Sequence, residues 1–114
     1  MKRHSMITLG VIILVVIVAL SVIYFRSLNP GVPADIAKCI GDKSELYVKL
    51  GCTHCEDQKK MFGDSYQYLK TIDCFYNLDL CLNKSIQATP TWIIEGKQYV
   101  GLQQIETLQR VTGC

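Results

Sequence analysis

The pentapeptide Gly51-Cys52-Thr53-His54-Cys55 separates an apolar run, residues 46–50, from a run of good helix formers, residues 56–62. The first run predicts a strand and the second a helix, so both cysteines are expected at the helix N-terminus. Unpaired backbone N–H groups and the helix dipole favour an anion there. Because the ionised thiol is the reactive form, this placement predicts a lowered pKa and a nucleophilic role for Cys52. His54 can add positive charge beside the Cys52 thiolate, and Cys55 completes a dithiol–disulfide pair.

Two other interpretations of this cysteine pair follow from the residues alone. Cys74 and Cys81 could complete a tetrahedral zinc site with it. Zinc-binding pairs usually lie on loops, however, and six residues rather than two to four separate Cys74 from Cys81. The other alternative is an inert structural disulfide. The order of strand, C-x-x-C and helix favours a redox-active pair over both, and we expect no metal site.

Met6 to Phe25 is a run of twenty residues without a charge, rich in Ile, Val and Leu. As a helix it spans about 30 Å, which is enough to cross the hydrocarbon core of a bilayer. A cleaved signal peptide is the alternative, with Ala19-Leu20-Ser21 as the nearest candidate cleavage site. The apolar run is longer than the usual signal core of about 7–15 residues and continues past that site. The sequence therefore favours an uncleaved anchor.

The charges around this run predict its orientation. Lys2 and Arg3 precede it and only Arg26 follows closely, which places the N-terminus in the cytoplasm and the C-terminal domain outside, at the cell membrane. Six cysteines in 114 residues fit an oxidising compartment. Without these three basic residues, nine Lys and Arg remain against ten Asp and Glu. No basic run suggests nucleic-acid binding.

The chain divides into an anchor, a linker and one small domain. We assign residues 1–26 to the cytoplasmic tip and transmembrane anchor, 27–35 to a linker rich in turn residues, and 36–114 to the domain. Asp35 and Asp79 are expected to begin short helices, and Gly41, Gly63 and Gly113 to end helices. The predicted strands are 45–50, 70–74, 91–94 and 98–100, and the predicted helices 36–40, 56–62, 80–84 and 101–111.

Pro90 directly precedes the predicted strand 91–94. It is either a simple strand-start residue or a cis-proline in a fixed turn. Strand, C-x-x-C, helix, strand, helix, X-Pro, hairpin and helix is the order of elements in the thioredoxin fold. Residues 36–114 resemble the thioredoxin-like domain found fused to, or beside, bacterial and plant vitamin K epoxide reductase homologues. The resemblance rests on Cys52-Thr53-His54-Cys55, Gln58-Lys59-Lys60-Met61-Phe62-Gly63, Asp73-Cys74, Cys81, Pro90-Thr91-Trp92, Gly101-Leu102-Gln103 and Thr112-Gly113-Cys114.

The resemblance implies a compact α/β fold, a small mixed sheet flanked by helices, preceded here by one transmembrane helix. It makes Cys52 the nucleophile, Cys55 the resolving cysteine, and Pro90 the cis-proline that faces them. Thr53 stands where related domains often carry proline. The resemblance also implies structural disulfides among the other four cysteines, which permit three connectivities. The pairs that we expect are Cys74–Cys81 and Cys39–Cys114.

We therefore expect a membrane-anchored, extracytoplasmic thiol–disulfide oxidoreductase that acts on secreted or membrane proteins with cysteines. The resemblance implies a membrane partner, a vitamin K epoxide reductase homologue that reoxidises the pair with quinone. The chain itself needs no metal or organic cofactor. His54 and the helix start favour an oxidase over an isomerase or reductase, whereas Glu56 and Asp57 oppose this. Leu46 stands where many thioredoxins bury an acid, which also argues against a reductase. The alternative is a structural or binding module with static disulfides or zinc.

Overall fold

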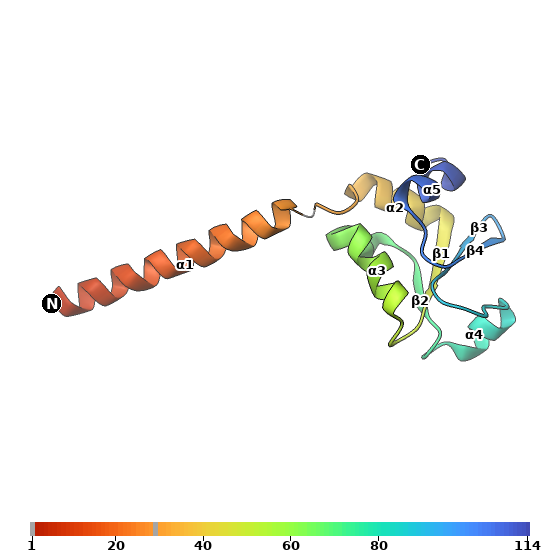
Figure 1. Cartoon of the computed structure of the whole chain (residues 1–114), viewed down its shortest axis with the longest axis horizontal. Helices are drawn as coiled ribbons and strands as arrows, with labels where there is room; N and C mark the ends of the chain where they lie inside the picture. Colours follow the sequence, from red (N-terminus) through yellow and green to blue (C-terminus); the bar gives the residue numbers. More distant parts are fainter. Residues whose placement is uncertain (1, 29) are drawn as a thin grey trace. The chain divides into compact units, whose positions relative to one another are not determined.

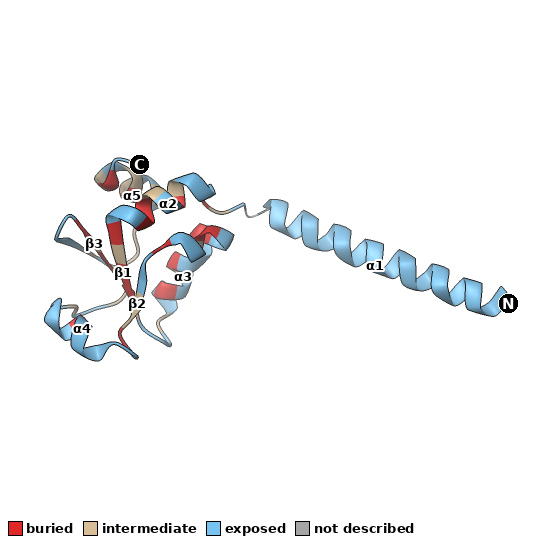
Figure 2. Cartoon of the chain, turned by 180° about the vertical axis from the view of Figure 1, so that it is seen from behind, coloured by how far each residue is buried: buried red, intermediate tan, exposed pale blue. Residues whose placement is uncertain are grey.

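The computed structural model describes residues 2–28 and 30–114, and the chain divides into two units, Met1–Pro30 and Gly31–Cys114. The first unit contains one helix of 27 residues, α1 (Lys2–Leu28), whose described side chains are exposed along its whole length (Figures 1 and 2). Among the described residues, α1 alone is a helix long and apolar enough to cross a membrane. A signal sequence near an N-terminus can also form a helix that is long and apolar enough to do so.

A mixed four-stranded sheet forms the centre of the second unit, with the strand order β2-β1-β3-β4. The first strand, β1 (Ser44–Val48), pairs in parallel with β2 (Thr71–Asp73) and antiparallel with β3 (Thr91–Ile94). A tight turn joins β3 to its antiparallel neighbour, β4 (Lys97–Val100). Parallel neighbours require a long crossover, and the segment between β1 and β2 that carries the C-x-x-C pair supplies it.

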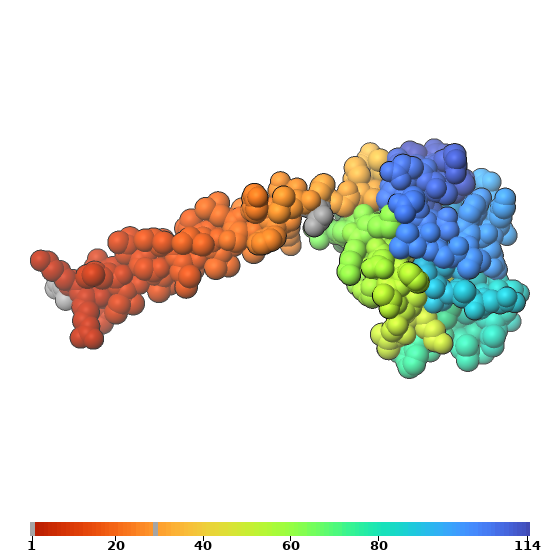
Figure 3. Space-filling model, viewed as in Figure 1, coloured from red at the N-terminus to blue at the C-terminus, as the bar shows by residue number. Residues whose placement is uncertain are grey.

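Four helices and one 3₁₀ segment accompany the sheet. The α2 helix contacts both the 3₁₀ segment and α5. The space-filling view shows the segments of α2, α3 and α5 on neighbouring parts of one surface (Figure 3). The bounds of these elements are α2 (Ala34–Lys43), α3 (Thr53–Phe62), η1 (Gly63–Tyr68), α4 (Leu78–Asn83) and α5 (Ile105–Thr112).

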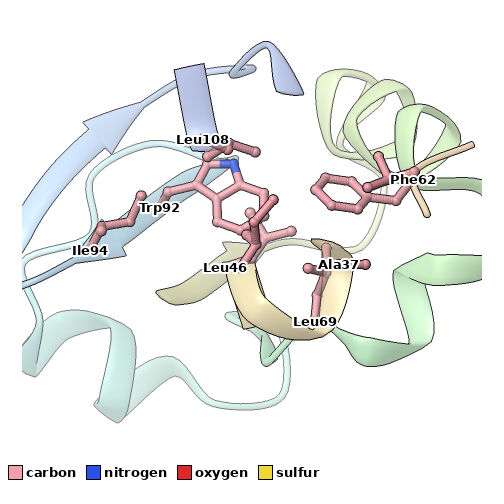
Figure 4. Packing of buried hydrophobic residues seen from close by; sticks show 9 residues of the cluster. Ala37, Leu46, Phe62, Leu69, Trp92, Ile94 and Leu108 are labelled. Atoms are coloured by element: carbon pink, nitrogen blue, oxygen red, sulfur yellow. The ribbon is translucent and has the colours of Figure 1, made fainter. Parts of the chain in front are cut away.

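Two hydrophobic clusters use adjacent residues of β1. Successive side chains of a strand point to opposite faces of the sheet. Leu46 therefore belongs to the larger cluster, with Phe62 and Trp92, whereas Tyr47 belongs to a smaller one with two cysteines. The rings of Phe62 and Trp92 lie 5.9 Å apart between centroids, so α3 is packed directly against β3 (Figure 4). This contact holds the C-terminal end of α3, at Phe62, against β3 near the start of that strand.

The sequence prediction of α2 is wrong at both ends. Pro33, rather than Asp35, precedes the first helical residue, and the helix continues past Gly41 to Lys43. Gly41 is buried, and a Cβ atom there would clash with the backbone carbonyl oxygen of Tyr68. Glycine is needed because η1 approaches the helix closely, and not because the helix ends.

Two other helices begin at residues that differ from the prediction. The short helix α4 starts behind Asn77 and not behind Asp79. The last helix, α5, begins at Ile105 rather than at Gly101, because backbone hydrogen bonds hold the preceding residues outside the helix. The N–H of Gly101 donates to the carbonyl of Pro90 at 2.7 Å. Gly63 and Gly113 follow α3 and α5 with φ of 58° and 73°, which confirms both predicted ends.

Candidate active site

The two cysteines of the C-x-x-C pair lie at the start of α3, where the first turn of the helix brings them together. Cys52 is the N-cap residue, and its Sγ accepts a hydrogen bond from the backbone N–H of Cys55 at 3.2 Å. Gly51, with φ of 82°, makes the turn out of β1 that this position requires. The pair forms a disulfide with Cα atoms 5.2 Å apart. An N–H group directed at Cys52 Sγ would stabilise a thiolate on this sulfur after reduction.

The two sulfur-bearing residues differ in their access to solvent. Cys52 is half-buried, whereas only 5% of Cys55 is exposed. A bulky reactant can therefore approach Cys52 more readily than Cys55. This difference in exposure suits a pair in which the more exposed cysteine reacts with the partner and the buried cysteine then resolves the mixed disulfide.

The Thr89–Pro90 turn lies beside Cys52. Its peptide bond is cis, and Pro90 is almost fully buried. The carbonyl oxygen of Thr89 is 3.5 Å from Cys52 Sγ. The structure thus brings together Cys52, Cys55 and the turn at Pro90, three of the positions that the sequence analysis selected.

His54 occupies the outer surface of α3. Its side chain is 76% exposed, and Nδ1 is 4.0 Å from Oδ2 of Asp57. Lys60 Nζ lies 3.7 Å from the other carboxylate oxygen of Asp57. Asp57 therefore opposes the positive charge that His54 would contribute near the sulfurs, and solvent screens what remains. The helix N-terminus is the stronger candidate for stabilising the Cys52 thiolate.

Strand β1, which precedes the cysteine pair, directs the apolar side chain of Leu46 toward the larger hydrophobic cluster and the phenol of Tyr47 toward the other face of the sheet. Leu46 is fully buried. Its neighbour Tyr47 donates a hydrogen bond from its hydroxyl to Oε2 of Glu45 at 2.7 Å. Burial, and then this hydrogen bond with the adjacent negative charge, raise the pKa of Tyr47 to about 12. Tyr47 consequently stays neutral at physiological pH.

The other four cysteines form two further disulfides. Cys39 of α2 is joined to the C-terminal Cys114, and Cys74, at the end of β2, is joined to Cys81 of α4. Of the three connectivities that four cysteines permit, this is the one that we selected from the sequence. In residues 2–28 and 30–114, no group of three or more His, Cys, Asp or Glu is placed to hold a metal ion.

Gln58 was not predicted to be a site residue, although it is fully buried and lies one turn after Cys55. Its amide connects three groups from other parts of the domain. The Oε1 atom accepts from the indole N–H of Trp92 at 3.2 Å and from the backbone N–H of Gln103 at 2.8 Å, and Nε2 donates to the Gln103 carbonyl at 3.0 Å. The helical spacing of positions 55, 58 and 62 places Gln58 on the same inward face as Cys55 and Phe62. A polar residue on this buried face is the sequence signal from which its role could have been predicted.

These observations define the class of the domain. A mixed sheet with the order β2-β1-β3-β4, a C-x-x-C pair at the N-terminus of the helix after β1, and a cis-proline before β3 give it a thioredoxin-like fold.

Comparison with known proteins identifies a curated relative, the thiol-disulfide oxidoreductase LTO1 of Arabidopsis thaliana. The two sequences are 32% identical over 79 residues, which is 61% of this chain and 21% of LTO1. The chain thus spans about a fifth of the length of that relative. A solved structure, the NTD_N/C domain of alkylhydroperoxide reductase AhpF from Enterococcus faecalis, matches 70% of this chain and 44% of that one. Its identity is 20% and its TM-score 0.45. No protein-family model matches the sequence.

Proposed function

We propose that this chain is a thiol–disulfide oxidoreductase whose reactive pair is Cys52 and Cys55. The observation that carries the proposal is the environment of Cys52 Sγ. This sulfur caps α3 and accepts the N–H of Cys55 at 3.2 Å, and the residue Cys52 is more exposed than Cys55. The curated relative is named as an enzyme of this kind, which supports the same assignment.

The exchange reaction uses the two cysteines in succession. In the reducing direction, the Cys52 thiolate attacks one sulfur of a partner disulfide, and the partner's other sulfur leaves as a thiolate. The thiol of Cys55 then loses its proton and attacks Cys52 Sγ in the mixed disulfide. This closes the Cys52–Cys55 disulfide and releases the second partner thiolate, so two electrons have passed to the partner. Oxidation of a partner dithiol follows the same steps in reverse and consumes the Cys52–Cys55 disulfide.

We place the net direction of the reaction on the oxidising side. Hydrogen bonding and the helix N-terminus stabilise the reduced thiolate form, and a couple with a stabilised reduced form is a stronger oxidant. The apolar, buried Leu46 supplies no acid for proton transfer behind the pair. His54 contributes little to this bias, because Asp57 lies next to it and opposes its charge, as the sequence indicated.

The proposal includes a membrane location and a membrane partner. Helix α1 would anchor the chain with its N-terminus in the cytoplasm and its thioredoxin-like domain outside, where disulfides persist. From the sequence resemblance, we infer that a vitamin K epoxide reductase homologue in the same bilayer reoxidises the pair with quinone. Confinement of both proteins to one membrane would raise their effective concentration. Secreted or membrane proteins with cysteines would be the substrates, and no metal or organic cofactor is required in this chain.

A glutathione titration tests the proposal against the alternative of a domain with static disulfides. The purified chain is equilibrated in buffers of graded ratio of reduced to oxidised glutathione, and its free thiols are alkylated and located by mass spectrometry. We expect the Cys52–Cys55 disulfide to open within the glutathione range while Cys39–Cys114 and Cys74–Cys81 stay closed. If the C-x-x-C disulfide resists reduction as strongly as the other two, the oxidoreductase assignment is wrong.

A further inference from the structure

The buried amide of Gln58 joins the redox helix to the segment that follows β4. Through Oε1 and Nε2 it binds both the N–H and the carbonyl of Gln103, as a neighbouring strand would. The same Oε1 accepts the indole N–H of Trp92, which lies on β3 two residues after Pro90. One side chain of α3 therefore contacts both the strand that begins at Pro90 and the segment beyond β4.

A packing role alone does not require glutamine at this position. The inward-facing neighbours on α3 are Cys55 and Phe62, and a fully buried apolar side chain would extend the same hydrophobic face. Burial of a polar group is costly unless its hydrogen bonds are formed. Here no buried side-chain polar atom among the described residues lacks a hydrogen-bond partner, so the amide and its partners are matched. The hydrogen bonds of the Gln58 amide hold three groups in place, namely the indole N–H of Trp92 and the backbone N–H and carbonyl of Gln103.

The contacts of Gln58 connect it to two groups that lie on different sides of Cys52, namely Cys55 and the Thr89–Pro90 turn. On one side, Gln58 lies one helical turn from Cys55, whose backbone N–H donates to Cys52 Sγ. On the other, the segment bound by Gln58 is also held by the hydrogen bond from Gly101 N–H to the Pro90 carbonyl at 2.7 Å. Thr89, the residue before Pro90, has its carbonyl oxygen 3.5 Å from Cys52 Sγ. Gln58 thus fixes the distance between the helix that carries the sulfurs and the turn that faces them.

We propose that Gln58 is a positioning residue of the redox pair, and that its hydrogen bonds favour the reduced state. This inference rests on the proposed thiol–disulfide activity. In the oxidised form the covalent bond between Cys52 and Cys55 itself keeps the turn closed. In the reduced form that bond is gone, and the placement of α3 by Gln58 keeps the Cys55 N–H directed at the Cys52 sulfur. Loss of the Gln58 amide therefore destabilises the reduced, dithiol form of the domain more than the oxidised, disulfide form.

The test compares the equilibrium constant of the C-x-x-C couple with glutathione in wild type, Gln58→Met and a control, all in the full chain. Methionine preserves the length and burial of the side chain while removing the hydrogen bonds to Trp92 and Gln103. We expect an equilibrium shift of about tenfold toward the disulfide, equivalent to about 30 mV, and a higher pKa for the Cys52 thiol. The control is Ile40→Val, which removes core volume from α2 and no hydrogen bond. Its unfolding midpoint should fall while its equilibrium constant stays at the wild-type value.

A second variant addresses the case in which Gln58→Met does not fold. Trp92→Phe keeps an aromatic ring in the core and removes only one of the hydrogen bonds to Gln58, so a smaller shift, about threefold in the same direction, is expected. Equilibrium constants of the folded variants that match the Ile40→Val control would overturn the inference and leave the proposed function intact. A wild-type disulfide that glutathione cannot open would overturn both.

Discussion

Replacement of Cys55 by alanine is expected to end turnover and to leave Cys52 joined to its partners. The Cys52 thiolate keeps its place at the start of α3, where backbone N–H groups stabilise it, so attack on a partner disulfide still occurs. The mixed disulfide then persists because no second thiol is within reach to resolve it. If the chain is anchored as we propose, complexes should accumulate in its membrane and disappear on treatment with reductant. Non-reducing gels followed by mass spectrometry would identify them. Turnover should fall at least a hundredfold.

The controls for this experiment separate trapping from misfolding. Cys52→Ala combined with Cys55→Ala should trap nothing, because the attacking sulfur is absent. Cys74→Ala should still turn over at temperatures where the domain is folded, since that cysteine belongs to a separate disulfide. Two classes of trapped protein are expected, namely secreted proteins with cysteines and one recurring membrane protein. A folded Cys55→Ala protein that captures no partner would favour a module with static disulfides.

The second large effect concerns the disulfide between Cys39 and Cys114. It closes a loop with a sequence separation of 75 residues, which covers most of the unit Gly31–Cys114. Loop-closure entropy gives such a bridge a stabilising contribution of about 4.5 kcal/mol. A domain of this size buries a small core, so this is a large part of its total stability. Replacing both cysteines by alanine should lower the melting temperature by on the order of 20 °C, as followed by circular dichroism.

The matched comparison is removal of the Cys74–Cys81 disulfide in the same way. Its sequence separation is 7 residues, and the corresponding contribution is about 2.5 kcal/mol. We expect the melting temperature to fall by roughly half as much. Equal losses from the two double variants, or a larger loss from the shorter loop, would show that local packing and not loop entropy determines these contributions.

Much of the fold and site follows from local sequence signals. The run before Cys52, the helix formers after Cys55, and the glycines at 63 and 113 specify elements through periodicity and backbone conformation, which a single sequence contains. The sequence also indicates the reactive pair, because its chemistry depends on the spacing of two cysteines and on the helix that follows them.

Features that depend on contacts between distant segments were not predictable in this way. Gly41 looks like a helix end, yet it is an interior residue that allows Tyr68 to approach. Gln58 looks like an ordinary helix former, and only the folded chain brings Trp92 and Gln103 to its amide. In both cases a partner that is distant in the sequence determines the role of the residue.

The central claim is that the Cys52–Cys55 disulfide is chemically transferable, and a direct transfer experiment tests it. The oxidised chain is mixed with a reduced peptide that contains two cysteines, and the thiols of both are counted by alkylation and mass spectrometry at intervals. The account predicts that one disulfide forms in the peptide for each chain that gains two thiols, located at Cys52 and Cys55, and that Cys52→Ser abolishes the transfer. A wild-type chain that keeps all three disulfides while the peptide stays reduced would contradict it.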